Sequence, residues 1–446
     1  MKLDFRGAMV VCGLAIFSSQ ALAQSQAPAT LFENVRVFDG SGAPVSGPRH
    51  VLVRGNLIEA ISDKPIRIEA SIPLTRIRGA GRTLMPGLID THTHLAMTTI
   101  SQARLMSSDN NYATLVSAQD AGEMLMRGFT AVRDAGGPVF GLKMAIDEGR
   151  IPGPRIWPTG AMLSQTSGHG DFRFIGELPR SNGDLHLSER FGYTAIVDGE
   201  PEMLRRVREQ LMRGATQIKL MGGGGVTSIY DPLDANQFTE KEIRAAVAAA
   251  EDWGTYVMIH AYTPQSIQRA VRAGVKSIEH GQLADEETIK VMAEHGAWLS
   301  IQPFMGDPDP RFPEGSPNRI KQLQVAQGTD RAIRLARKHG VRIAWSLDIL
   351  FNPQRAATQG RELARMSHWF KPAEVLQMAT RTNAELLALS GMRNPYPGKL
   401  GVVEVGALAD LILVDGDPVA NLNLIADPHK NFMVIMKDGR IYKNAL

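Results

Sequence analysis

The alternation of short apolar strands with amphipathic helices across residues 85–390 constrains the fold more than any other feature of the chain. This alternation is typical of parallel strands joined by helical crossovers. Eight strand–helix repeats predict an α/β fold, a (β/α)8 TIM barrel. The first strand ends at His92 and His94. The other expected strands are Phe129–Arg133, Arg155–Thr159, Gln217–Met221, Tyr256–His260, Lys276–His280, Trp298–Gln302 and Val341–Trp345.

A doubly wound open sheet is the structural alternative. That fold would bind a nucleotide through a glycine-rich loop after its first strand, and no G-x-G-x-x-G motif occurs there. The glycine run 222–225 also lacks the Lys-Ser/Thr of a phosphate-binding loop. These two absences favour the barrel.

The two ends of the chain share a different texture, in which β-rich runs are separated by Gly, Asp and Pro. Residues 24–84 and 391–446 are each too short for a catalytic domain, so we expect them to pair into one small β-sandwich domain. The barrel, 85–390, would then be inserted between its halves. The expected strands are Leu31–Phe38, His50–Val53, Leu57–Ile61, Leu74–Ile77, Gly401–Gly406, Ala409–Val414, Val434–Met436 and Arg440–Tyr442.

Residues 1–23 predict a cleavable signal peptide. Lys2 and Arg6 precede an apolar run at 8–17, and cleavage is expected after Ala23. The apolar run is short for a membrane span, so no stable membrane anchor is expected and the enzyme should be periplasmic or secreted. The only cysteine, Cys12, lies inside this segment, so the mature chain would form no disulfide.

Polar residues gather where the barrel strands end. His92 and His94 are two residues apart on one strand, so both imidazoles point to the same face. Each residue alone has an ordinary explanation, such as a core histidine, a surface ion pair or a helix N-cap. The carboxyl ends of barrel strands meet at one mouth, however, and six such residues there indicate a metal centre. The six are His92, His94, Lys219, His260, His280 and Asp348.

Several motifs now point to a family. The chain resembles the amidohydrolase superfamily, in its binuclear-metal form with a carboxylated lysine, over nearly all of its mature length. The motifs that carry the resemblance are Pro86–His94, Thr380–Leu389 and Gly406–Pro418. Leu163–Asp171 and Lys219–Val226 are most similar to the branch that contains Xaa-Pro dipeptidases and hydrolases of N-acyl amino acids such as ochratoxin. One motif departs from the family: the eighth strand ends Ser346-Leu347-Asp348 rather than Gly-Ser/Thr-Asp.

The resemblance implies two divalent metal ions, which we expect to be Zn²⁺, although Mn or Co would suit the same ligands. His92, His94 and Asp348 would bind the buried ion, and His260 and His280 the exposed one. Lys219 would bridge both as N6-carboxylysine, because a free lysine is cationic near neutral pH. Asp348 would take a proton from the attacking water and pass it to the leaving amine.

Two further residues are candidates on the loops after strands three and four. His169 would stabilise the oxyanion, and Tyr230 would donate a hydrogen bond to a substrate carboxylate. The insert Asp171–Glu200 is rich in Gly, Ser and charge, so it indicates a lid or specificity loop. Two of its arginines, Arg173 and Arg180, are further candidate donors to a carboxylate. Its aromatic residues, which could line an apolar pocket, are Phe172, Phe174, Phe191 and Tyr193.

These observations predict a metal-dependent amidohydrolase that cleaves dipeptides or N-acyl amino acids with a free C-terminal carboxylate. A hydrolase of a cyclic amide or a phosphotriester on the same metal centre is the main alternative. A non-catalytic binding protein ranks lower, since it would be expected to have lost ligands. The net charge of +3 without a basic block gives no indication of nucleic-acid binding. We expect a homo-oligomer acting on a small molecule.

Overall fold

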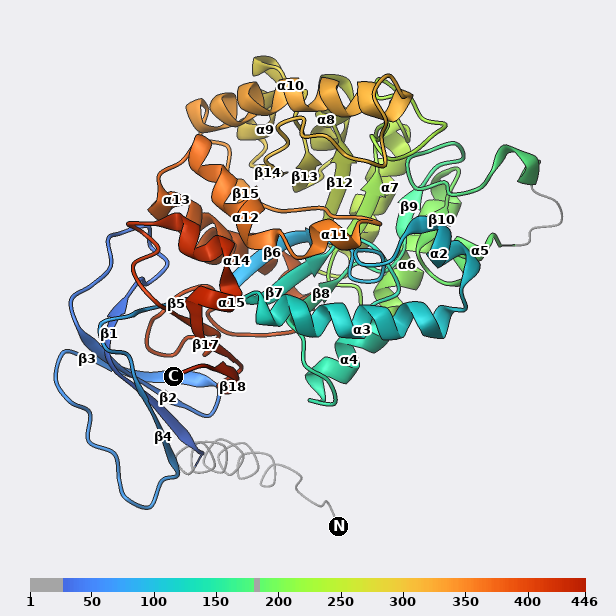
Figure 1. Ribbon diagram of the computed structural model, residues 1–446. Helices are drawn as coiled ribbons and strands as arrows, with labels where there is room; N and C mark the ends of the chain where they lie inside the picture. The colour runs from blue at the N-terminus through green and yellow to red at the C-terminus, as the bar shows by residue number, and fades with distance from the viewer. Residues whose placement is uncertain (1–26, 180–184) are drawn as a thin grey trace, which may run out of the picture.

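The computed structural model describes residues 27–179 and 185–446. The expected signal peptide, 1–23, and Arg180 therefore lie outside the described residues. The described chain forms a barrel and a smaller sheet domain, and Figure 1 shows blue β1–β4 beside red β17 and β18, away from the yellow and orange helices. In the part of the chain described, no helix combines the length and apolar character needed to cross a membrane.

The barrel strands run parallel in two hydrogen-bonded sheets, ordered β10-β9-β11-β12-β13-β14-β15 and β6-β7-β8. All eight expected barrel strands are present, which confirms the predicted fold. The strands are β6 Leu88–Thr93, β7 Phe129–Asp134, β8 Arg155–Pro158, β9 Met162–Ser164, β10 Thr194–Ile196, β11 Ile218–Met221, β12 Val257–Ala261, β13 Ser277–His280, β14 Trp298–Ile301 and β15 Ile343–Trp345.

The two sheets meet at two seams. At the first seam, strand β8 is interrupted by a turn at Gly160, whose φ is +81°, and the strand resumes as β9. Pro158 O still accepts from Thr216 N at 2.8 Å, while Leu163 pairs with Leu220 of β11. The third barrel strand is therefore β8 and β9 together, with a kink between them.

At the second seam, β15 meets β6. Asp348 N donates to His92 O at 3.0 Å, just beyond the end of β15. The Asn383 side chain spans the two strands: Nδ2 donates to Ile89 O at 2.7 Å and to Trp345 O at 2.8 Å. The first and last barrel strands are thus joined by a side chain from the helix that follows the barrel.

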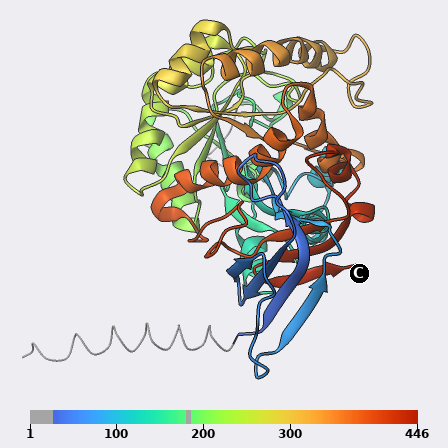
Figure 2. The same cartoon turned by 90° about the vertical axis from the view of Figure 1, so that its left-hand side faces the viewer.

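Helices surround the strands because each buries one apolar stripe. Helix α8 (Pro264–Arg272) is an example: Ile267, Ala270 and Val271 are buried, and Thr263 caps the helix by accepting from Ser266 N. Figure 2 shows the helices enclosing the strands. The other helices are α2 Gln102–Ser107, α3 Asn110–Met126, α4 Phe140–Asp147, α5 Leu187–Arg190, α6 Glu200–Arg213, α7 Glu240–Glu251, α9 Glu286–Glu294, α10 Pro317–Lys338, α11 Pro353–Ala356, α12 Gln359–Ala364, α13 Pro372–Gln377, α14 Asn383–Leu387 and α15 Pro428–Asn431.

The small domain is built from both chain ends, as expected. Its strands follow the order β18-β17-β16-β5-β1-β2-β3, and β4 also pairs with β1. β1 joins the two halves, since it pairs with β2 and β4 along its first part and with β5 through Arg36 and Val37. The strands are β1 Ala29–Val37, β2 Arg49–Arg54, β3 Leu57–Ser62, β4 Leu74–Arg78, β5 Thr83–Pro86, β16 Leu411–Val414, β17 Phe432–Lys437 and β18 Arg440–Asn444.

One expected strand was wrong. Residues 401–406 form turns rather than a strand. Gly401 and Gly406 have φ values of +74° and +82°, which an extended strand does not allow. The segment instead closes back on β3, where Ile58 O accepts from Gly406 N at 2.8 Å.

Candidate metal centre and substrate cavity

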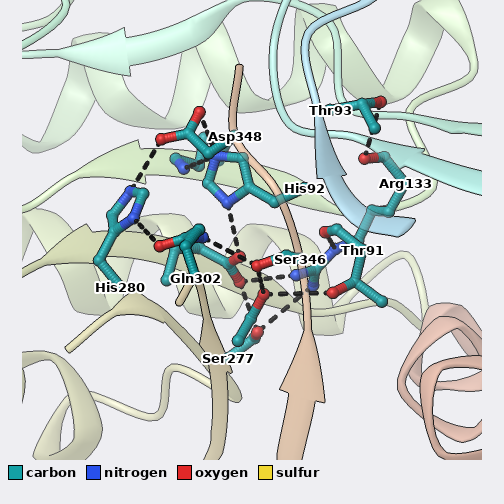
Figure 3. Close-up of polar contacts among 12 residues, drawn as sticks. Thr91, His92, Thr93, Arg133, Ser277, His280, Gln302, Ser346 and Asp348 are labelled. Carbon is teal, nitrogen blue, oxygen red and sulfur yellow. Dashed lines mark hydrogen bonds and ion pairs between the residues drawn. The ribbon is translucent and has the colours of Figure 1, made fainter. Parts of the chain in front are cut away.

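The six polar residues predicted at strand ends line one cavity of about 360 Å³. They come from the ends of four strands, β6, β11, β12 and β13, and from the turn after β15, and all but Asp348 are buried almost completely. Figure 3 shows His92, His280 and Asp348 pointing toward one another. The barrel geometry therefore brings together residues that lie as far apart in sequence as His92 and Asp348.

Three of the six form a compact group of potential ligands: His92, His94 and Asp348. Asp348 Oδ1 lies 3.5 Å from His92 Nε2 and 3.4 Å from His94 Nε2. The opposite ring nitrogens are held elsewhere, because His94 Nδ1 lies 3.0 Å from Gly136 O and His92 Nδ1 lies 2.8 Å from Glu279 Oε2. Contacts of this kind fix the tautomer, so both Nε2 atoms are presented to a metal.

Asp348 provides the test of whether a metal fits. Its Oδ1 is buried and has no hydrogen-bond partner among the described residues, which is unfavourable for a carboxylate oxygen. Its φ is +55°, a left-handed conformation that holds the carboxylate at the mouth of the barrel. Two imidazole nitrogens and an unpartnered carboxylate oxygen form a donor set suited to a divalent metal, so the residues fit the ion.

His260 and His280 lie beside this group. His280 has a φ of +81°, and its Nδ1 lies 2.8 Å from Gln302 Oε1, which leaves Nε2 facing Asp348 at 3.9 Å. His260 Nε2 lies 3.1 Å from Gly224 O, so Nδ1 is the nitrogen that could bind a metal. The rings of His260 and His280 are 4.5 Å apart between centroids.

Lys219 lies beside His92 in the same cavity. Its Nζ is 3.3 Å from His92 Nε2, and its side chain is buried. Burial lowers the pKa of Lys219 to about 8, against the raising effect of the Glu279 and Asp348 charges. A larger share of neutral amine is therefore present at neutral pH, which is the form that reacts with CO2.

A buried ionic chain supports His92 from below. Glu279 accepts from Arg133 Nη2 at 2.7 Å and from Ser277 Oγ at 2.5 Å, while its other oxygen holds His92 Nδ1. Arg133 also donates to Thr91 O at 2.6 Å, beside His92 on β6. Figure 3 shows this chain running beneath the metal group. It fixes the ring orientation of a potential ligand. Polar residues inside two strands were its only indication in the sequence.

Ser346, where the family motif differs, also has a structural role. Its Oγ accepts from Gln302 Nε2 at 2.8 Å and lies 3.1 Å from Ser300 Oγ. The amide of Gln302 is thereby oriented with Oε1 toward His280 Nδ1. Ser346 therefore acts on the position of a potential ligand through Gln302.

His169 reaches the cavity from the loop after β9. Its ring stacks on His260 at 4.2 Å between centroids, and Nδ1 lies 2.7 Å from Ser228 Oγ and 3.5 Å from Asp231 Oδ2. A Cβ on Gly225 would come within 1.9 Å of the imidazole, so only glycine permits this approach. The glycine run after β11 thus makes room for His169 rather than binding phosphate.

Most of the other loop residues predicted to contact a substrate do not line the cavity. Tyr230 is 40 % exposed and is not among the residues that line the cavity, so its role in binding a carboxylate stays a prediction without geometric support. Arg173 is also outside the cavity lining and is paired with Asp171 at 2.6 Å. Among the aromatic residues, Phe172 lines the cavity, Tyr193 is buried in the core and Phe174 is 57 % exposed. The insert also contains α5 and β10, so only part of it is a loop.

The far wall of the cavity was not predicted from the sequence. This wall is formed by the segment between β14 and α10 and by the segment from the end of β15 through α12. It combines aromatic residues with four arginines, which are Arg311, Arg355, Arg361 and Arg365. The cluster of arginines in 355–365 was visible in the sequence, but nothing local placed it beside the metal group.

Comparison with known proteins gives consistent results. The family model described as the amidohydrolase family matches residues 83–443. Ochratoxinase from Aspergillus niger is 31 % identical over 419 residues, covering 87 % of this chain and 83 % of the relative. A prolidase crystallised with N-methylphosphonate-L-proline has a TM-score of 0.83 at 35 % identity, covering 93 % of this chain and all of the other. An Xaa-Pro dipeptidase with bound methionine has a TM-score of 0.80 at 30 % identity, with the same coverage.

Proposed function

Because this chain belongs to the amidohydrolase family and is a metal-dependent hydrolase, we propose that it cleaves an amide bond whose leaving group is an amino acid with a free carboxylate. The substrate would be a hydrophobic or Xaa-Pro dipeptide, or an N-acyl aromatic amino acid. The observation that carries the proposal is the convergence of six potential ligands on one cavity that also contains arginines and aromatic side chains.

Two metal ions would occupy the site. His92, His94 and Asp348 would hold one, His260 and His280 the other, and Lys219 as N6-carboxylysine would bridge them. We expect Zn²⁺, given the imidazole-rich ligand set. When bound, the ions supply a water of lowered pKa and polarise the substrate carbonyl.

The chain's own residues would then move protons and stabilise charge. Asp348 lies at the mouth of the cavity with Oδ1 turned toward two imidazoles, which leaves Oδ2 to carry a proton to the leaving nitrogen. His169, held at Nδ1 by Ser228, would donate from Nε2 to the developing oxyanion. A positioned donor of this kind typically contributes about 10²–10³ in kcat.

The relatives and the cavity together support the substrate class. The similar solved structures include a prolidase and an Xaa-Pro dipeptidase, and the sequence relative is an ochratoxinase. Phe172, Phe304 and Phe351 give the cavity apolar surface for a side chain. The arginines of the far wall give it cationic donors for a carboxylate.

The test compares Ala-Phe with Ala-Phe-amide by kcat/KM, using the metal-loaded enzyme. We expect the acid to be hydrolysed at least tenfold faster than the amide, because a charged donor left unpaired costs more than 1–3 kcal/mol when buried and about 1.4 kcal/mol is tenfold. A lactam and an organophosphate triester serve as controls for the alternative reactions. Equal hydrolysis of acid and amide, or preferred turnover of a control substrate, would contradict the proposal.

A further inference from the structure

The far wall of the cavity has more positively than negatively charged side chains. It carries four guanidinium groups, those of Arg311, Arg355, Arg361 and Arg365. Only three carboxylates face them, and these belong to Asp307, Asp309 and Glu362. A guanidinium in such a wall that has no partner within the protein is available to bind an anionic group of a ligand.

Two of these arginines are paired with carboxylates of the same wall. Arg311 pairs with Asp309 at 2.7 Å and also donates to Leu350 O. Arg365 binds Asp307 and lies 3.2 Å from Glu362. These pairs fasten the segment between β14 and α10 to the segment around α12.

Arg355 and Arg361 complete the wall. Arg355 lies 3.5 Å from Glu362 Oε1. The side chain of Arg361 makes no hydrogen bond or ion pair with any residue in the described ranges 27–179 and 185–446, and it is exposed to the cavity. Arg361 is therefore the guanidinium that the protein leaves for a ligand.

The orientation of Arg361 follows from the packing of its helix. Thr358, Arg361, Glu362 and Arg365 line the cavity at the spacing i, i+3, i+4 and i+7, which is one face of a helical turn. The opposite face is fixed by close packing, since a Cβ on Gly360 would come within 2.1 Å of Ile425 O. The helix cannot turn Arg361 away from the cavity without breaking this contact.

The start of the same helix is tied to the metal group. Gln359 is buried, and its Nε2 donates to Asp90 Oδ2 at 3.1 Å. Asp90 Oδ1 in turn accepts from His92 N at 3.1 Å and from Leu347 N at 3.2 Å, next to Asp348. The register of α12 is thus set by the strands that carry the potential metal ligands.

We propose that Arg361 binds the free carboxylate of the leaving amino acid and is the residue that makes the enzyme select acids over amides. This inference rests on the proposed function, which supplies the carboxylate. Arg361 is a specificity residue, because it contacts the substrate away from the scissile bond. Phe351, which precedes α11 in the same wall, would contact the apolar side chain of that amino acid.

The experiment measures the ratio of kcat/KM for Ala-Phe and Ala-Phe-amide in the metal-loaded wild-type enzyme, Arg361→Ala and Arg361→Lys. The control is Arg208→Ala, which removes an exposed helical arginine outside the cavity. In Arg361→Ala we expect the ratio to fall by about tenfold, or about 1.4 kcal/mol, through a higher KM for the acid. Arg361→Lys should keep part of the preference, and Arg208→Ala all of it.

A second measurement does not depend on turnover of a peptide bond. Inhibition by L-phenylalanine, the product, should weaken by about tenfold in Arg361→Ala, while inhibition by L-phenylalaninamide should not change. A wild-type enzyme that ignores the carboxylate would overturn the proposed function together with this inference. A wild-type enzyme that selects the acid, with Arg361→Ala selecting it equally well, would overturn only the role of Arg361. Equal loss on both substrates would also overturn that role.

Discussion

Replacing Glu279 with Gln should destabilise the protein far more than the same Glu→Gln substitution at an exposed site. Glu279 is fully buried and accepts from Arg133, Ser277 and His92. Arg133 is also fully buried, and its other donors reach only neutral groups, Thr91 O and Tyr256 OH among them. The amide would leave the guanidinium charge inside the barrel without a counter-ion.

The magnitude follows from this arrangement. Breaking a buried ion pair from one side costs about 3–5 kcal/mol, because the remaining charge cannot return to water. The pKa of Arg133 supports a charged state: burial lowers it, but the interactions with Glu279 and Tyr256 together raise it by more, and the result lies above the usual range. With an unfolding entropy of about 0.9 kcal/mol/K for a chain of this length, the melting temperature should fall by about 3–5 °C.

The assay is urea and thermal unfolding of the metal-free protein, prepared with a chelator so that loss of a metal does not add to the effect. Glu148→Gln is the matched control, because its pair with Arg150 is exposed at 50 % and 74 % and should contribute less than about 1 kcal/mol. Arg133→Met combined with Glu279→Gln should recover much of the loss. A Glu279→Gln variant as stable as the control, or a double variant with additive losses, would refute the reasoning.

Three other changes test different parts of the molecule. Lys219→Ala should lose most bound metal and activity, and small carboxylic acids should restore part of both; two tightly bound ions by metal analysis would contradict the bridging role. Asp348→Asn should fold and keep at least one metal but lose turnover by at least about 10²-fold, and normal turnover at full metal loading would rule out proton transfer. Asp438→Asn should lose more stability at pH 7 than near pH 3. Burial raises the pKa of Asp438, but the charge and hydrogen bond of Arg155, 2.7 Å away, lower it below 3.8 overall. The Asp438 carboxylate therefore adds stability above about pH 4, and this stabilisation is lost as the pH falls. Equal differences between the unfolding curves at the two pH values would contradict the prediction.

The metal group was predictable because a barrel converts local information into spatial proximity. A polar residue at the carboxyl end of any strand faces the same mouth, so the ends of β6, β11, β12 and β13 could be combined without knowing the packing of helices. His169 was found through a motif rather than through geometry. Its placement depends on Gly225, whose lack of a side chain could not be linked to it from sequence alone.

The substrate-binding loops were less predictable for a physical reason. Arg173 was a reasonable carboxylate donor until the structure paired it with Asp171, two residues away. Arg361 forms no ion pair of this kind with the residues that the structure describes, and its position depends on how α12 packs against residues near Ile425 in the chain that returns from the barrel. Tyr230 follows the glycine run closely, yet its side chain is 40 % exposed and does not line the cavity. Export and oligomeric state stay predictions.

The pairing of β5 with β16 has a consequence for the order in which the molecule is made. β1–β4 can associate soon after they leave the ribosome, but β5 has no antiparallel partner until Leu411–Val414 has been synthesised, after the whole barrel. The barrel seam waits almost as long, since Asn383 is needed to join Ile89 to Trp345. Neither domain can therefore complete its strand pairing before the last few seconds of translation, at about 5–20 residues per second. A chain truncated before β16 would carry all six potential metal ligands and still lack the strand that completes its small domain.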